Sequence, residues 1–127
     1  MLREGPIPRF VHGVGEYVAG ILLLVAPFVF GFDSDSAIAV SIVVGVLVLV
    51  LAASTEGPTS LVNQVPLGLH VVLDYALAGL LIGIPFIFGF SGEGAPTVFF
   101  ITLGVVHLMV TIGTRFQKGG SDAARDR

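Results

Sequence analysis

No Asp, Glu, Lys or Arg occurs in four long, mostly apolar segments of the chain, residues 17–32, 36–55, 75–92 and 94–114. A helix that crosses a membrane needs about 20 mostly apolar residues. The second and fourth segments reach this length unaided, and the first and third reach it when they include Glu16 and Asp74. The chain is therefore expected to be all-α, with four transmembrane helices near residues 12–31, 37–55, 69–89 and 96–115.

The composition agrees with a membrane protein and excludes several kinds of site. Only 12% of the residues are charged, about half the share in an average soluble domain. The absence of cysteine excludes disulfides, thiolate metal sites and iron–sulfur clusters. The net charge of −3 gives no indication of a nucleic acid partner. The expected partner is the lipid bilayer.

One six-residue phrase occurs twice, as PFVFGF at 27–32 and PFIFGF at 85–90. At a shift of 58, residues 7–32 and 65–90 are identical at 11 of 26 positions. The second and fourth helices align best at a shift of 59. This indicates one membrane domain over residues 1–127, built from two helical hairpins. Repeat 1 covers about 7–55 and repeat 2 about 65–115. Both copies enter the membrane from the same side, so their pseudo-two-fold axis runs along the membrane normal.

The connections and the charges predict the topology. FDSDS and SGEGAP are short turns, in which Ser36 is expected to cap the second helix and Pro96 to lie in the first turn of the fourth. The longer link TEGPTSLVNQVP is expected on the membrane surface, and the tail 116–127 is expected to be disordered. Lys and Arg occur only near the two ends of the chain, so the positive-inside rule places both termini in the cytoplasm.

The repeated pattern P-x₃-H-x₃-[ED]-Y, followed by P-F-x-F-G-F, resembles the SPW-repeat family of small prokaryotic integral membrane proteins. Members carry Ser-Pro-Trp and then Gly-Phe, usually in two copies over four helices. This chain has Ala26-Pro27-Phe28 and Ile84-Pro85-Phe86 instead. The resemblance implies this fold and a multi-pass protein of the prokaryotic cell membrane. It implies no activity and no catalytic residue.

Eight residues of the repeated phrase are candidate motif residues: Pro27, Phe28, Gly31, Phe32, Pro85, Phe86, Gly89 and Phe90. The prolines are expected to kink or fray the helix ends, and the glycines to close them in a left-handed conformation. The phenylalanines are expected at the outer lipid–water boundary, as anchors. The alternative reading is a binding surface in the outer leaflet.

A second group of candidates is polar and lies inside the expected spans: His12, Glu16, Tyr17, His70, Asp74, Tyr75 and His107. His12 and Glu16 are four residues apart and share a helix face, as do His70 and Asp74. The two pairs are expected to converge near the pseudo-two-fold axis at the cytoplasmic side. The same faces continue through Gly20 and Ala78, which permit close helix packing.

His107 has no counterpart in the first repeat, where Val48 takes its place, and it is expected to approach Asp74 or Tyr75. The tyrosines are read as interface anchors. The pattern of Gly79 and Gly83 is read as packing, within the bundle or between protomers.

Three functions of the polar cluster stay open at this stage. Each histidine and its acid can form a hydrogen-bonded pair that packs the two halves together. The cluster can also relay protons or ions, because histidine changes its charge near neutral pH. The third possibility is a metal or haem site. No metal or cofactor is assigned, and a chain without one is the first expectation.

No nucleophile elbow, P-loop, dinucleotide fingerprint or metalloprotease motif occurs, so we expect no enzyme. The expected function is a scaffold, an accessory subunit or a homo-oligomer. The alternative is an oligomeric proton, ion or metal conductor, or a metal or haem carrier that uses the polar cluster.

Overall fold

A computed structural model describes residues 6–55, 61 and 64–114 of the chain. These residues form four helices, α1 (Arg9–Val29), α2 (Asp35–Ser54), α3 (Leu67–Ile87) and α4 (Gly94–Gly113). All four are long and apolar enough to cross a membrane, which confirms the expected fold class. The disorder expected for 116–127 concerns residues outside the described part of the chain, as does most of the link between α2 and α3.

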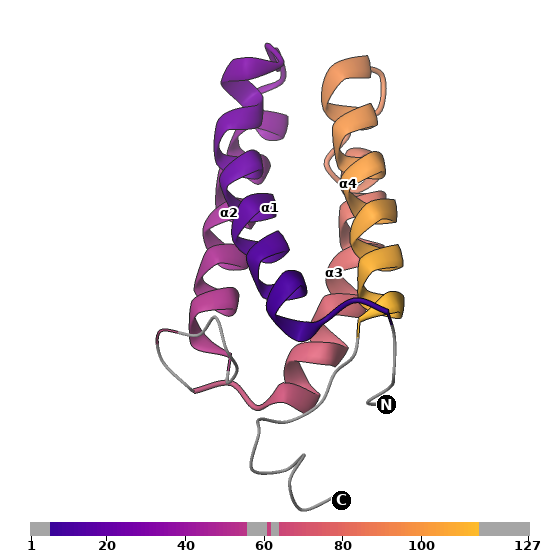
Figure 1. Ribbon diagram of the computed structural model, residues 1–127. Helices are drawn as coiled ribbons and strands as arrows, with labels where there is room; N and C mark the ends of the chain where they lie inside the picture. The colour runs from indigo at the N-terminus through magenta and orange to yellow at the C-terminus, as the bar shows by residue number, and fades with distance from the viewer. Residues whose placement is uncertain (1–5, 56–60, 62–63, 115–127) are drawn as a thin grey trace, which may run out of the picture.

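The helices form two antiparallel hairpins, α1 with α2 and α3 with α4, which stand side by side (Figure 1). The two short turns lie together at one end of the molecule, called here the turn end (Figure 1). The starts of α1 and α3 and the ends of α2 and α4 lie at the other, called here the terminal end (Figure 1). This arrangement is the duplicated hairpin that the repeat predicts.

Every helix begins two or three residues earlier than the charge pattern suggests. Pro8 and Pro66 stand directly before α1 and α3 in extended conformation, with φ of −64° and −63°. Helix α2 is capped by Ser34 and not by Ser36, because the Ser34 side chain accepts a hydrogen bond from the amide of Ala37 at 3.2 Å. The expected cap was wrong for this reason. Pro96 lies in the first turn of α4, as expected.

The repeated phrase ends α1 and α3 in the same way. Gly31 has a φ of +64° and Gly89 a φ of +76°, a region that L side chains adopt at a cost. The Phe32 amide donates to the Pro27 carbonyl at 3.0 Å, and the Phe90 amide donates to the Pro85 carbonyl at 2.9 Å. These six-to-one bonds are those of a Schellman motif. They confirm the left-handed closure of both helix ends.

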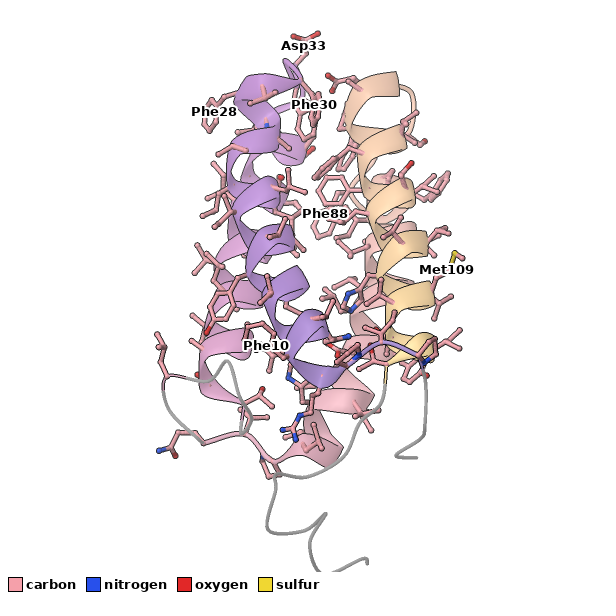
Figure 2. All side chains as sticks on the ribbon, in the orientation of Figure 1. Phe10, Phe28, Phe30, Asp33, Phe88 and Met109 are labelled. Atoms are coloured by element: carbon pink, nitrogen blue, oxygen red, sulfur yellow. The ribbon has the colours of Figure 1, made fainter. Side chains whose placement is uncertain are left out.

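The left-handed glycine also decides where the phenylalanines point. Phe28 is 73% exposed and projects away from the bundle (Figure 2), whereas Phe32 is only 5% exposed. Phe90 is buried in the same way as Phe32. The expectation that all these rings lie at the lipid boundary was therefore wrong for Phe32 and Phe90, because the chain reverses at the glycine and turns them inward.

The inward rings form an aromatic core at the turn end, between the hairpins. The rings of Phe32, Phe90 and Phe99 all contact Phe100, with ring centroids 5.5–6.5 Å apart. Apolar side chains from all four helices extend this core, among them Leu23, Ala26, Val44, Val48, Leu81 and Ile84. The centre of the turn half of the bundle is thus filled by apolar groups.

Small residues set the spacing within each hairpin. A Cβ on Gly45 would lie 2.9 Å from the carbonyl oxygen of Gly20, and one on Gly104 would lie 3.1 Å from that of Ala78. These contacts confirm the expected packing role of Gly20 and Ala78. Gly79 faces open space, so it takes no part in packing within the bundle.

Candidate functional site

The two hairpins are joined at the terminal end by a pair of equivalent backbone contacts, called here the clasp. The Ile7 amide donates to the Gly113 carbonyl at 2.9 Å, and the Val65 amide donates to the Ser54 carbonyl at 2.8 Å. Figure 1 shows the residues before α1 crossing to the end of α4. In each hairpin, the residue two positions before the first helix is therefore hydrogen-bonded to the last residue of the other hairpin's second helix.

Four buried side chains next to the clasp form a closed ring, called here the His–carboxylate ring. His12 Nε2 lies 3.2 Å from Glu16 Oε2 and 2.9 Å from Asp74 Oδ2. His70 Nε2 lies 2.8 Å from Glu16 Oε2 and 3.0 Å from Asp74 Oδ2. Two of the four contacts join α1 to α3. The expected convergence of the two pairs is therefore confirmed, and each acid serves both histidines rather than its own alone.

Two threonines fix the orientation of the imidazoles. Thr114 Oγ1 donates to the Val110 carbonyl at 2.5 Å, so its oxygen accepts the hydrogen of His12 Nδ1 at 2.8 Å. The other repeat has the same chain of contacts, from His70 Nδ1 to Thr55 Oγ1 at 2.6 Å and on to the Leu51 carbonyl at 2.7 Å. Because a neutral imidazole has one N–H, the hydrogen on Nδ1 leaves the lone pair of Nε2 for the ring.

Thr55 and Thr114 were not among the residues singled out in the sequence. They are 59 positions apart, the shift that aligns α2 with α4, so the repeat itself contained the signal. Each lies directly after the last residue of its helix. Each also binds the histidine of the other hairpin, and this long-range pairing cannot be read from local spacing.

The ring has an additional polar side chain on one side only. His107 Nε2 lies 3.6 Å from Asp74 Oδ1, so the expected approach to Asp74 is confirmed. Asp74 Oδ1, His107 Nε2 and Thr111 Oγ1 are buried without a hydrogen-bond partner among the described residues. The positions equivalent to His107 and Thr111 in α2 are Val48 and Ala52. The pseudo-symmetry is therefore broken by polar groups on the α4 side.

Polar burial is concentrated at the terminal end. Of the nine buried polar or charged side chains in the described residues, only Ser41 lies in the turn half. The ring includes neither Tyr17, which is half-buried, nor Tyr75, which is 40% exposed. The site is thus a compact polar centre closed toward the turn end by the aromatic core.

The geometry limits what can occupy the ring. Each Nε2 lies 2.8–3.2 Å from two carboxylate oxygens. Each Nε2 therefore needs a proton shared between those oxygens, or the ring needs a cation, since facing lone pairs repel. Two imidazolium and two carboxylate groups satisfy this requirement with no net charge. One divalent cation with two neutral imidazoles and two carboxylates satisfies it equally, and His, Asp and Glu are ligands of first-row transition metals.

Comparison with known proteins gives one result. No curated protein and no solved structure matches the chain. The model of the SPW repeat domain matches residues 10–114, which include both hairpins, the ring and its threonines. This range covers most of the chain and agrees with the two PF-x-F-G-F phrases and the four helices. The chain belongs to the SPW repeat family and is a small multi-pass membrane protein.

Proposed function

We infer that this protein is a non-enzymatic membrane scaffold, a rigid unit whose outer helix faces pack against neighbouring membrane proteins or further copies of the chain. One observation carries this proposal. The ring, the threonines and the clasp join the two hairpins to each other through buried contacts. Buried hydrogen-bond networks of this kind rigidify the arrangement of the helices that form them.

The outer surface supports the same role. Large apolar side chains are exposed on every helix, including Val18, Val50, Val72 and Met109, and Figure 2 shows Met109 pointing outward. These faces can contact lipid or another membrane protein. An enzymatic role has less support, because the threonines beside the histidines donate their hydrogens to main-chain carbonyls. Neither hydroxyl is thus arranged for a histidine to act as its base.

A monomeric conductor also has less support than a scaffold. A path through the molecule needs polar groups along its length. Among the buried polar side chains of the described residues, the turn half has only Ser41, whose hydroxyl already donates to the Leu23 carbonyl at 2.5 Å. Conduction would therefore need an assembly of several copies.

The scaffold proposal is tested with the protein extracted in mild detergent. We expect His12→Ala combined with His70→Ala to lower the thermal midpoint and to disperse the assembly seen by native mass spectrometry. The control for stability is Val14→Ala combined with Val72→Ala, two equivalent exposed positions on the same helices. This control is expected to keep the thermal midpoint, because it leaves the contacts between the hairpins intact. A ring variant that melts and assembles like wild type would contradict the proposal.

The location in the prokaryotic cytoplasmic membrane, with both termini inside, is part of the proposal. It is supported by the Lys and Arg residues, all of which lie near the two ends of the chain, because positive residues favour the cytoplasmic side. Because the chain has no cysteine, single cysteines report sidedness directly. We expect an impermeant maleimide applied to intact cells to label Ser91→Cys and not Pro6→Cys. The reverse labelling would invert the topology.

A further inference from the structure

The His–carboxylate ring has the donors of a metal site. His12 Nε2, Glu16 Oε2, His70 Nε2 and Asp74 Oδ2 all lie within 4.8 Å of one another and belong to buried residues. Two nitrogens and two carboxylate oxygens form a donor set suited to Zn²⁺ and similar first-row dications. The donors come from two helices, α1 and α3, so the site depends on the folded bundle rather than on one flexible segment.

The threonines give this donor set the second layer that metal-bound histidines normally have. A histidine ligand usually donates its other ring N–H to a fixed acceptor, which sets the tautomer and the ring orientation. His12 and His70 do so to Thr114 and Thr55, at 2.8 and 2.6 Å. In the neutral form both Nε2 lone pairs therefore point into the ring. An imidazolium would donate the same Nδ1 hydrogen to its threonine, so the threonines suit a metal site as well as they suit an ion pair.

Charge and size permit the exchange of protons for one ion. A dication with two carboxylates and two neutral imidazoles has no net charge, which matters because unbalanced charge in a membrane is costly. Ligand atoms around tetrahedral zinc lie roughly 3.3 Å apart, from bond lengths of about 2.0–2.1 Å. The ring contacts are 2.8–3.2 Å. Every pair among the four donor atoms lies within 4.8 Å. To hold a tetrahedral ion, the donors need to separate by a few tenths of an ångström along the sides of the ring and to approach each other across its diagonals.

The α4 side provides an independent indication of a ligand. Buried polar atoms almost always have a partner, yet Asp74 Oδ1, His107 Nε2 and Thr111 Oγ1 have none among the described residues. The 3.6 Å between His107 Nε2 and Asp74 Oδ1 is too long for a good hydrogen bond. It is close to the separation of two ligands on one ion. His107 lies outside the four-residue group and faces Asp74 Oδ1, the carboxylate oxygen that the ring does not use.

From these observations we propose that the ring binds one divalent first-row transition-metal ion of the zinc class. His12, Glu16, His70 and Asp74 are its ligands, and His107 is an additional ligand from the α4 side. The count is one ion, because a second dication would add two uncompensated charges. This proposal goes beyond the scaffold role and does not depend on it, since a bound ion is measured without reference to any assembly.

The test uses the full chain in detergent, stripped with a chelator and then loaded with Zn²⁺. Native mass spectrometry counts the ions, and competition with a fluorescent chelator gives the affinity. We expect one Zn²⁺ per chain, no binding of Mg²⁺, and loss of at least about 100-fold in affinity for His12→Ala combined with His70→Ala. Retention of the ion by this variant, or no Zn²⁺ on the wild-type protein, would overturn the proposal.

Milder variants keep the test decisive if the double variant does not fold. Thr55→Val removes the acceptor of His70 Nδ1 and is expected to weaken Zn²⁺ binding roughly 10–100-fold, whereas Thr55→Ser retains the hydroxyl and the affinity. His107→Val installs the residue of the other repeat. The His107→Val variant is expected to keep one ion. The visible spectrum of its Co²⁺ form is expected to shift toward that of a four-coordinate Co²⁺ site. Equal affinities for Thr55→Val and Thr55→Ser would reject the site, and an unchanged Co²⁺ spectrum would remove His107 from it.

Discussion

At the scale of single residues, the positions that matter most are those where a small side chain determines what its neighbour does. Thr55 and Thr114 contribute little volume, yet each decides which nitrogen of a histidine faces the ring. Gly45 and Gly104 likewise have no side chain to pack, yet they let the two helices of each hairpin approach closely.

The close approach at Gly104 predicts a strong effect of substitution there. A Cβ at Gly104 would lie 2.8 Å from Ile82 Cγ1 and 3.0 Å from Leu81 Cβ. We expect Gly104→Val to lower the free energy of unfolding by about 1–3 kcal/mol through overpacking. Gly79→Val, where a Cβ meets nothing within 4 Å, is the matched control. Reversible unfolding in detergent measures both, and equal losses would show that helix propensity alone is responsible.

The residue scale also separates what the sequence can predict about the site from what it cannot. The spacing of four residues placed each histidine beside its own acid, and the repeat predicted that the two pairs meet. Neither revealed that the contacts across the axis, at 2.8 and 2.9 Å, are as short as the local ones. That detail depends on how closely α1 and α3 approach, which is set by contacts far away in the sequence.

At the scale of elements, each hairpin contains a proline inside its first helix, and the first hairpin compensates for it. Pro27 has no N–H to donate to the carbonyl of Leu23, four residues earlier. Ser41 on α2 donates its hydroxyl to that carbonyl at 2.5 Å. In the second hairpin the position equivalent to Ser41 is Phe100, which belongs to the aromatic core.

This compensation predicts that Ser41 and Pro27 are coupled. Ser41→Ala leaves the Leu23 carbonyl without its donor and is expected to cost about 0.5–2 kcal/mol of stability. Adding Pro27→Ala supplies a backbone N–H and is expected to recover most of this loss. Pro85→Ala is the control, because the carbonyl that Pro85 leaves without a backbone donor lies in α3, away from Ser41. A double-mutant cycle of unfolding free energies tests the coupling, and strict additivity of Ser41→Ala and Pro27→Ala would rule it out.

The first and last residues of the helices differ between the charge pattern and the structure, because local capping residues decide where a helix begins. The uncharged segments located all four helices, because burial in lipid requires long apolar stretches. They misplaced the ends by up to three residues, because the starts of α1 and α3 follow Pro8 and Pro66 and that of α2 follows the Ser34 cap. The inward turn of Phe32 also escaped prediction, since it depends on the left-handed backbone at Gly31.

At the scale of the whole molecule, the two hairpins are fastened at both ends. The ring and the clasp hold the terminal end, and Glu93 accepts hydrogen bonds from the amides of Asp33 and Ser34 at the turn end, at 2.6 and 2.9 Å. The bond to Ser34 also places a carboxylate at the N-terminus of α2, where the helix dipole favours it. The halves are therefore held by contacts that do not require the covalent link between them.

This predicts that the link can be cut without separating the hairpins. A protease site inserted between residues 56 and 60, and cleaved after purification, is expected to leave a one-to-one complex of the two halves by native mass spectrometry. The same cleavage in the His12→Ala, His70→Ala background is expected to release them. If the cleaved wild-type halves came apart as readily, the ring would contribute nothing to their association.

The clasp has a consequence for the origin of this architecture. Neither hairpin makes these contacts within itself. In each one, the segment before the first helix binds the end of the other hairpin, and the histidine binds the threonine of the other hairpin. A gene that encoded a single hairpin could make the same contacts only by pairing two copies of its product. Joining two copies in one chain replaces that pairing by an encounter at millimolar effective concentration. It also frees the two halves to differ, and His107 opposite Val48 is a difference that two identical copies of one hairpin cannot have.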